Sequence, residues 1–238
     1  MRLNVWATLG ITQLNMHKVQ DPGRSEKLMS IAKISAYEVP EFSGNNRADW
    51  ELVPRRAALL LHDLQEYFLK PFEGPGPLDV VVPNVQRLLD WAHANGVLVI
   101  YSAQGPKQNP VRRGLLTDFW GKGVPDEEVA QVATTFEVLP QDVVITKWRY
   151  SAFARTDLEN LLRFRGIDQL IITGVYAPLG CTLTAADAFS RDIKPFFVRD
   201  AVADFSLEEH ESALKFVSGR CGVVCDTADL LVRETQSV

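Results

Sequence analysis

The stretch Ala57-Ala-Leu-Leu-Leu-His62 is a short, uninterrupted apolar run that ends in polar residues. A run of this kind predicts a strand that is buried on both faces, as in a parallel sheet covered by helices on both sides. Similar runs follow at Val97–Tyr101 and Gln169–Thr173. Between the first two runs, apolar residues recur at helical spacing up to the stop signal Asn95-Gly96. The chain therefore alternates strands with helices.

The same alternation continues to the end of the chain. Further strands are predicted at Val143–Thr146, Pro195–Val198 and Val223–Cys225, the last one at an edge of the sheet. The remaining helices are predicted over about 111–119, 126–136, 156–166, 181–191 and 206–219. Such a series requires right-handed crossovers between parallel strands. We therefore expect an α/β fold, a three-layer α/β/α sandwich around a mainly parallel, Rossmann-like sheet of six strands.

Composition and charge exclude several classes of protein. Residues 1–34 lean basic and lack a hydrophobic period, which predicts a flexible N-terminal extension before a single domain over 35–238. The 238 residues carry 25 Lys and Arg against 30 Asp and Glu, a net charge of −5. Nucleic acid is therefore an unexpected partner, because binding to phosphates needs a basic face. Neither a membrane span nor a signal peptide is recognisable, so we expect no membrane partner and a cytoplasmic location.

Polar residues follow the predicted strands directly. In a parallel sheet, ligands bind in the crevice outside the carboxyl ends of the strands. Asp63, Gln104, Lys147 and Tyr150 lie at such ends, as does the turn Gly174–Cys181. We therefore expect their side chains to converge.

Asp63 and Lys147 are the candidates for proton chemistry. Asp63 lies between a buried strand and aromatic residues, so desolvation favours its protonated form and suits a general acid. Lys147 can bind an anionic substrate or Asp63 itself. A direct ion pair would favour the ionised carboxylate, so we expect substrate or water to separate the two groups. The alternatives are an Asp that caps the next turn and a Lys that extends into solvent.

The remaining candidates bind rather than react. Gln104, Arg113, Trp120 and Tyr150 supply the donors and the aromatic wall that a carboxylated cyclic substrate requires. Gly180 allows backbone N–H groups at a helix N-terminus to approach an anion.

Cys181 is a candidate nucleophile, because a helix N-terminus lowers the pKa of a thiol. No histidine is obviously placed to activate it, and a buried structural cysteine is the alternative. Cys221 and Cys225 frame one short strand, and the chain has only 4 His, so we expect no zinc site. GxGxxG and Walker-type loops are missing, and we expect no nucleotide or other cofactor.

Several stretches together resemble the isochorismatase family over about residues 35–230. They are Arg56–Asp63 with Tyr67-Phe68, Tyr101–Gln104, Arg113–Gly121, Thr146–Phe153, Gly174–Gly180, Asp187–Phe196 and Ala203–Ser206. The resemblance implies hydrolysis of the enolpyruvyl ether of isochorismate, a chorismate-derived small molecule, to pyruvate and 2,3-dihydro-2,3-dihydroxybenzoate. It places the reaction in siderophore or secondary-metabolite biosynthesis.

The resemblance also implies residue roles. Asp63 matches the general acid, and Lys147 and the backbone of Gly180 complete the catalytic group. Substrate binding is implied for Gln104, Arg113, Trp120, Tyr150 and Tyr176. Relatives of this kind form homodimers or larger homo-oligomers, for which Trp148 and the helix over 180–193 are candidate contact surfaces.

Two departures from the family pattern leave alternatives open. Amidohydrolases of the family carry a cysteine where this chain has Gly180, and Cys181 is one place further. Pro178 stands where close relatives usually have histidine, and we expect it to push Ala177 towards extended geometry and to remove an N–H beside the pocket. The alternatives are the same chemistry on 2-amino-2-deoxyisochorismate, giving trans-2,3-dihydro-3-hydroxyanthranilate, a Cys181-dependent amidohydrolase, and a non-catalytic binding protein.

Overall fold

The apolar runs form one six-stranded sheet in the computed structural model, which describes residues 31–231. The strand order is β3-β2-β1-β4-β5-β6, and every pairing is parallel, so the predicted sandwich is confirmed. The strands are β1 (Ala57–His62), β2 (Leu98–Ala103), β3 (Val143–Thr146), β4 (Gln169–Val175), β5 (Lys194–Ala203) and β6 (Val223–Cys225).

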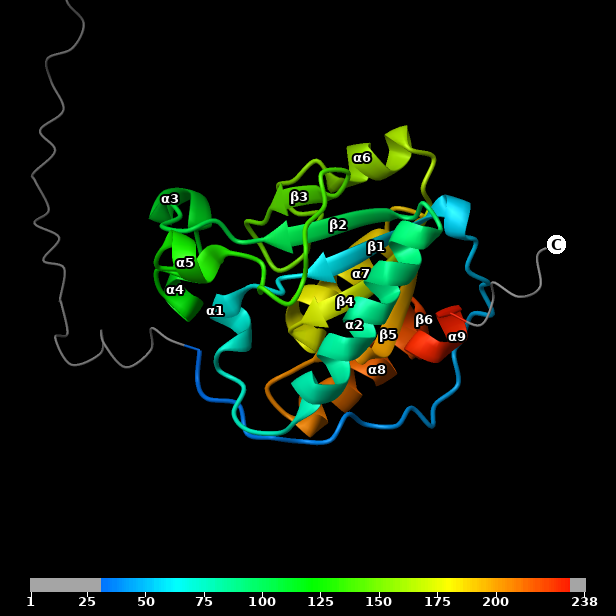
Figure 1. Cartoon of the computed structure of the whole chain (residues 1–238), viewed down its shortest axis with the longest axis horizontal. Helices are drawn as coiled ribbons and strands as arrows, with labels where there is room; N and C mark the ends of the chain where they lie inside the picture. The colour runs from blue at the N-terminus through cyan, green and yellow to red at the C-terminus, as the bar shows by residue number, and fades with distance from the viewer. Residues whose placement is uncertain (1–30, 232–238) are drawn as a thin grey trace, which may run out of the picture.

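Helices cover both faces of the sheet (Figure 1). α2 (Pro77–Ala94) and α9 (Thr227–Leu231) lie on one face, and α6 (Leu158–Phe164), α7 (Thr182–Phe189) and α8 (Leu207–Arg220) pack against the other. The short helices α1, α3, α4 and α5 gather beyond the ends to which the strand arrows point. Their bounds are Glu66–Leu69, Pro110–Arg113, Leu116–Trp120 and Glu127–Ala130, and two short helical turns span Pro54–Arg56 and Ala177–Cys181.

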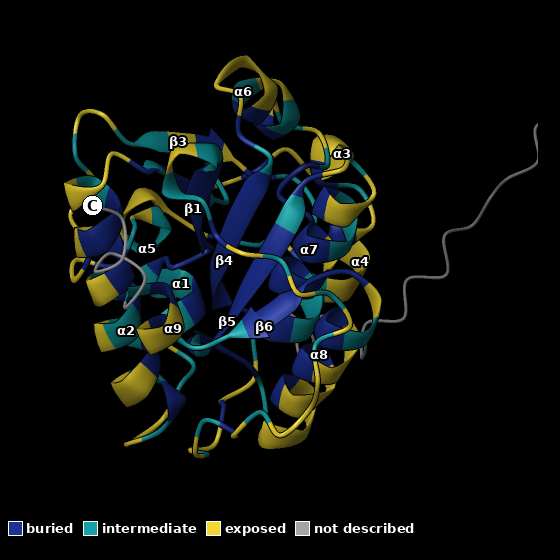
Figure 2. Cartoon of the chain, turned by 90° about the vertical axis from the view of Figure 1, so that its right-hand side faces the viewer, coloured by how far each residue is buried: buried dark blue, intermediate teal, exposed yellow. Residues whose placement is uncertain are grey.

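β1 shows how the sheet divides the core into two layers. Leu59 and Leu61 pack with the residues of α2, whereas Ala58 and Leu60 pack with those of α6, α7 and α8. All residues of β1 are buried. In Figure 2 the central strands β1, β4 and β5 are accordingly almost entirely dark blue, whereas the edge strand β3 carries exposed residues. Side chains of β1 that alternate between two apolar layers hold the end of the strand rigidly.

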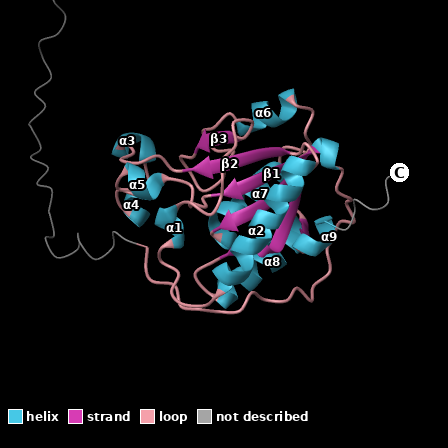
Figure 3. Cartoon of the chain, viewed as in Figure 1, coloured by secondary structure: helices cyan, strands magenta, loops and turns pink. Residues whose placement is uncertain are grey.

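Two predicted helices are shorter than expected, and both errors fall in the segment beyond the strand ends (Figure 3). The helix over 111–119 is broken into α3 and α4 at Gly114, whose φ of +60° ends the first helix. The helix over 126–136 ends at Ala130, because the chain then pairs with the loop after β1. Ala133 N–H donates to Leu64 O (2.8 Å), and Val132 bridges to Gln65.

β5 extends five residues beyond its predicted end. Arg199 and Asp200 interrupt the apolar pattern, but both are satisfied by neighbours: Arg199 pairs with Asp226, and Asp200 accepts from the backbone N–H of Thr227 (2.8 Å). The strand therefore continues to Ala203. This extension moves the end of β5 to the same edge as the other candidate residues.

The N-terminal prediction needs one correction. Ile34, which we placed in the extension, is 2% exposed and forms a parallel bridge with Phe72, so the packed part of the chain begins before residue 35. The rest of the predicted extension, residues 1–30, lies outside the described residues. Among residues 31–231, no helix is long and apolar enough to cross a bilayer.

Candidate active site

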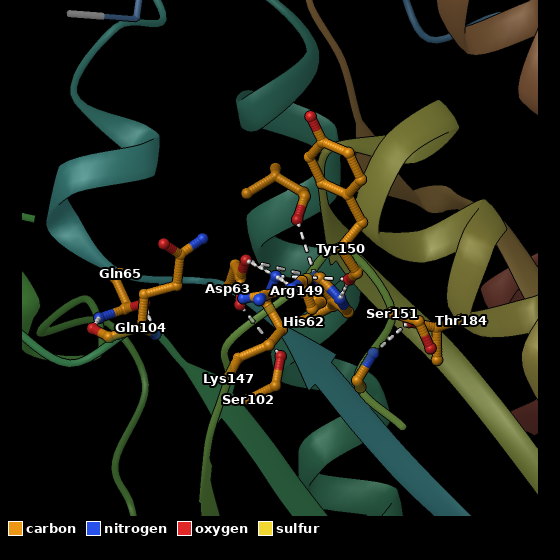
Figure 4. Close-up of polar contacts among 12 residues, drawn as sticks. His62, Asp63, Gln65, Ser102, Gln104, Lys147, Arg149, Tyr150, Ser151 and Thr184 are labelled. Carbon is orange, nitrogen blue, oxygen red and sulfur yellow. Dashed lines mark hydrogen bonds and ion pairs between the residues drawn. The ribbon is translucent and has the colours of Figure 1, made fainter. Parts of the chain in front are cut away.

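The eight residues to which the family resemblance assigns roles line one pocket at the carboxyl ends of β1, β2, β3 and β4, and the alternative nucleophile Cys181 does not. Figure 4 shows the polar contacts of Asp63, Lys147 and their neighbours. The predicted residues in the pocket lining are Asp63, Gln104, Arg113, Trp120, Lys147, Tyr150, Tyr176 and Gly180. The convergence that the strand-end rule predicts is therefore confirmed as geometry.

Asp63 is held in one orientation at the end of β1. It is 4% exposed and adopts a left-handed conformation, with φ of +51°, which costs a non-glycine residue about 1–3 kcal/mol. Its N–H donates to Ser102 O (3.0 Å), and Ser102 Oγ donates to Oδ1 (3.1 Å). The other carboxyl oxygen, Oδ2, lies 2.8 Å from Nζ of Lys147. The neighbouring strand thus fixes both the backbone and the carboxyl of Asp63.

Lys147 is 2% exposed and makes a direct ion pair with Asp63. Our expectation of substrate or water between the two groups is therefore wrong for the ligand-free protein. Nζ also donates to Arg149 O (2.8 Å), so the ammonium group stays inside the pocket instead of reaching solvent. Burial of both charges is tolerated because each has its counterion and further hydrogen bonds.

Arg113 brings a second cation into the pocket. Its guanidinium is held by the carbonyl of Gly121 (2.9 Å) and the side-chain oxygens of Gln104 (3.0 Å) and Gln108 (3.1 Å). It is 3% exposed, and burial lowers its pKa. Within residues 31–231 it has no carboxylate partner. A buried guanidinium that lacks a counterion indicates an anionic ligand.

An aromatic wall closes one side of the pocket. Phe205 stacks between Tyr176 (4.2 Å between centroids) and Trp120 (6.1 Å). Trp120 Nε1 donates to the Tyr150 hydroxyl (2.7 Å), and the Tyr176 hydroxyl donates to Phe68 O (2.7 Å). Tyr176 thus presents its ring to the pocket, whereas its hydroxyl is used within the protein.

Gly180 and Leu179 line the pocket, whereas Pro178 and Cys181 do not. Cys181 is fully buried in the core on the α7 side, and burial raises its pKa well above the ordinary value. Pro178 stands in the first positions of the helical turn Ala177–Cys181, where the missing N–H breaks no helical hydrogen bond. Ala177 belongs to that turn, so the expectation of extended geometry there is wrong.

Sequence reasoning missed several residues of the site. Phe205 lines the pocket and Asp204 precedes it, but they lie seven and six residues beyond the predicted end of β5 at 198. The strand-end rule would select them once the strand is known to reach Ala203. Further missed lining residues are Ile31, Tyr67, Phe68, Leu116, Val175 and Leu179. In residues 31–231, no group of three His, Cys, Asp or Glu side chains is arranged to hold a metal ion.

Comparisons with known proteins match residues 57–229 to the Isochorismatase domain. A curated relative, the Isochorismatase of Bacillus subtilis (strain 168), is 47% identical over 209 residues, which is 85% of this chain and 66% of that protein. The phenazine biosynthesis protein PhzD of Pseudomonas fluorescens is 46% identical over 189 residues, 79% of this chain and 90% of that protein.

Solved structures show the same fold. A cysteine hydrolase from Pseudomonas syringae pv. phaseolicola 1448A superposes with a TM-score of 0.72 at 25% identity, covering 81% of this chain and 98% of that one. The domain match spans most of the chain, and the curated relatives share nearly half of the aligned residues. The chain belongs to the isochorismatase family.

Proposed function

We propose that this chain hydrolyses the enolpyruvyl ether of isochorismate to pyruvate and 2,3-dihydro-2,3-dihydroxybenzoate, in siderophore or secondary-metabolite biosynthesis. One observation carries the proposal: the carboxyl of Asp63 and the guanidinium of Arg113 line the same pocket, and Arg113 has no carboxylate partner within residues 31–231. A substrate with two carboxylates and an electron-rich double bond fits an acid beside two cations.

In the proposed mechanism, the hard step is proton transfer to carbon. The methylene carbon of an enol ether is nucleophilic, so Asp63 protonates it and an oxocarbenium ion forms. Water then adds to the cationic carbon, and the hemiketal collapses to pyruvate, leaving the ether oxygen on the ring. A general acid contributes about 10²–10⁴-fold to the rate, and orientation and electrostatics supply the rest.

In this mechanism, Asp63 takes up a proton from solvent when substrate binds, so the ion pair with Lys147 is compatible with its role as an acid. Nearby anionic charge disfavours an ionised carboxylate, and the substrate brings two carboxylates into a closed pocket. Lys147 is then released to bind a substrate carboxylate, while Arg113 binds the other. Gln104, Trp120, Tyr150 and Tyr176 are proposed to hold the ring, and the backbone of Gly180 to approach the developing charge.

Charge favours isochorismate over its 2-amino analogue. Asp63 is the one carboxylate in the described pocket lining, and Lys147 already neutralises it. The ammonium group of 2-amino-2-deoxyisochorismate would therefore enter a pocket with two cations and no unpaired anion. We expect kcat/KM to be higher for isochorismate when both substrates are measured side by side.

The decisive test is pyruvate release from isochorismate by the purified full chain. Asp63→Asn keeps the size of the side chain and cannot donate the proton in the same way, so kcat should fall about 10²–10⁴-fold. Ser102→Ala, which removes one hydrogen bond to the same carboxyl, is the matched control and should cost far less. Full turnover by Asp63→Asn, or tight binding of substrate with no turnover by the wild type, would refute the proposal.

We also propose that two copies of the chain associate through the surface next to the pocket. Leu183 of α7 is 41% exposed. Val111 on α3 (88%), Leu115 between α3 and α4 (75%) and Phe119 on α4 (67%) are exposed as well. These apolar residues border one groove beside the predicted contact helix. Light scattering should give twice the mass of 26.6 kDa, and Phe119→Asp should reduce it; a monomeric wild type contradicts this proposal.

A further inference from the structure

His62 immediately precedes Asp63, and its ring is enclosed by a neighbouring segment. The residue is 0% exposed. At Gly180, an added Cβ would lie 2.7 Å from Nδ1 and 2.9 Å from Nε2 of His62. Normal carbon contacts are about 3.5–4.0 Å, so no side chain fits at position 180 while this ring is in place.

The backbone of His62 is just as restricted. His62 pairs with Gly174 in the β1–β4 register, and a Cβ at Gly174 would lie 2.7 Å from the backbone N of His62. Two glycines from one strand and the turn that follows it therefore accommodate a single histidine. The strand itself cannot shift to relieve a contact at position 180.

The ring has no freedom to move aside either. Nδ1 lies 3.0 Å from Val175 O, and Nε2 lies 3.2 Å from Tyr150 O. Burial lowers the pKa of His62 to about 4, so the imidazole is neutral at pH 7 and donates its one N–H to one of these carbonyls. Val175 and Tyr150 both line the pocket, so the ring connects two of its walls.

We propose that His62 sets the reaction class of this pocket by occupying the space that any side chain at position 180 requires. The catalytic meaning of this inference rests on the proposed function. With bare backbone at position 180, the pocket offers an acid, Asp63, and a cation, Lys147, but no attacking atom. A smaller residue at position 62 opens the space, and a cysteine at position 180 then fits where the ring was, next to Asp63, whose Oδ2 lies 3.8 Å from Nδ1 of His62.

A double-mutant cycle tests the exclusion. In the wild-type background, Gly180→Ala should lower the melting temperature by roughly 2–10 °C and kcat/KM by about 100-fold or more, because the ring and its neighbours must shift by about an ångström. In a His62→Val background, the same Gly180→Ala change should add little to either loss. Gly219→Ala, which meets no atom within 4 Å, is the matched control. Equal effects of Gly180→Ala in both backgrounds would overturn the proposal.

Thiol labelling provides a second, activity-independent readout. In His62→Val/Gly180→Cys, iodoacetamide should alkylate Cys at position 180: the thiolate displaces iodide, a C–S bond forms, and the proton goes to solvent. Peptide mass spectrometry should find the label there and not at the fully buried Cys181. Gly180→Cys with His62 intact should be strongly destabilised. A stable Gly180→Cys variant that is labelled as fast as the double variant contradicts the inference.

The two readouts separate this inference from the proposed function. Melting temperature and alkylation need no turnover, so strong coupling between positions 62 and 180 in a protein that does not hydrolyse isochorismate rejects the function alone. Additive effects in an active enzyme reject the inference alone. If the His62→Val variant does not fold, the cycle is repeated with His62→Ala. Loss of the fold in both variants would overturn the proposal, because His62 would then be required for folding itself.

Discussion

The two sides of the pocket are built differently. We call the residues at the strand ends, Asp63, Lys147 and Gly180, the floor, and the segment 104–121, which carries Arg113, the roof. All three floor residues are buried, and Asp63 follows β1, which is hydrogen-bonded to both β2 and β4. The roof consists of short helices, which leave Leu115 75% exposed. We therefore expect changes in the floor to reduce kcat and stability together, and changes in the roof to raise KM.

Of the variants that test this comparison, a change at Lys147 is expected to have the largest combined effect on stability and kcat. Lys147→Met keeps an unbranched side chain but removes the ammonium group, which leaves the buried Asp63 carboxylate without its counterion. Breaking such a pair costs about 3–5 kcal/mol of stability, and loss of the cation should reduce kcat about 10²–10³-fold. Denaturant unfolding and pyruvate release measure the two effects. Lys122→Met, at an exposed position, is the control, and an equally small loss at both positions would remove the distinction between floor and surface.

Arg113 tests the roof. Arg113→Gln removes the guanidinium that has no carboxylate partner within residues 31–231, so KM for isochorismate should rise about 10–100-fold, with a smaller change in kcat. Steady-state kinetics separate the two constants. The neighbouring Arg112→Gln changes an exposed guanidinium that stacks on Trp148 and should leave KM within about twofold. A fall in kcat at constant KM in Arg113→Gln would show that floor and roof are not functionally distinct.

Asp204, which directly follows β5, provides a test by pH. Asp204 is 0% exposed, neither carboxyl oxygen has a hydrogen-bond partner within residues 31–231, and burial raises its pKa to about 7. The folded state therefore binds more protons than the unfolded state between about pH 4 and 7, and the stability that Asp204 contributes falls as pH rises through this window.

Asp204→Asn cannot ionise, so its stability relative to wild type should increase by about 2 kcal/mol between pH 5 and 8. Thermal unfolding at the two pH values measures this difference. Burial lowers the pKa of His62 and His210 to about 4, so the stability that these two residues contribute falls as pH falls, the opposite of the effect of Asp204. Both histidines are present in wild type and variant, so their contributions cancel in the difference. A difference that does not change with pH would contradict the assignment to Asp204.

The smallest effect is expected at Cys181. Its thiol lies in the core and outside the pocket lining, so Cys181→Ala should keep kcat and KM within about twofold and cost only the packing of one small side chain. Pyruvate release and thermal unfolding check both points. An inactive but folded Cys181→Ala would restore the thiol alternative.

The floor could be predicted from the sequence and much of the roof could not, for physical reasons. Asp63 and Lys147 directly follow apolar runs, and the local pattern fixes where those strands end. The break at Gly114 and the early end of α5 depend on contacts with other segments. Phe205 was missed because Arg199 interrupts the apolar pattern of β5. The ion-pair partner of Arg199, Asp226, is distant in sequence. Local pattern shows none of these tertiary contacts.

The most direct test of the account is the fate of the ether oxygen when the wild-type chain acts on isochorismate in H₂¹⁸O. Protonation of the methylene carbon sends water to the pyruvyl side, so mass spectrometry of the dihydroxy ring product should show no ¹⁸O. Ring product kept in H₂¹⁸O without the protein controls for exchange. One ¹⁸O atom in the ring product would mean that water attacks the ring carbon, and that result would contradict proton transfer from Asp63 as the initiating step.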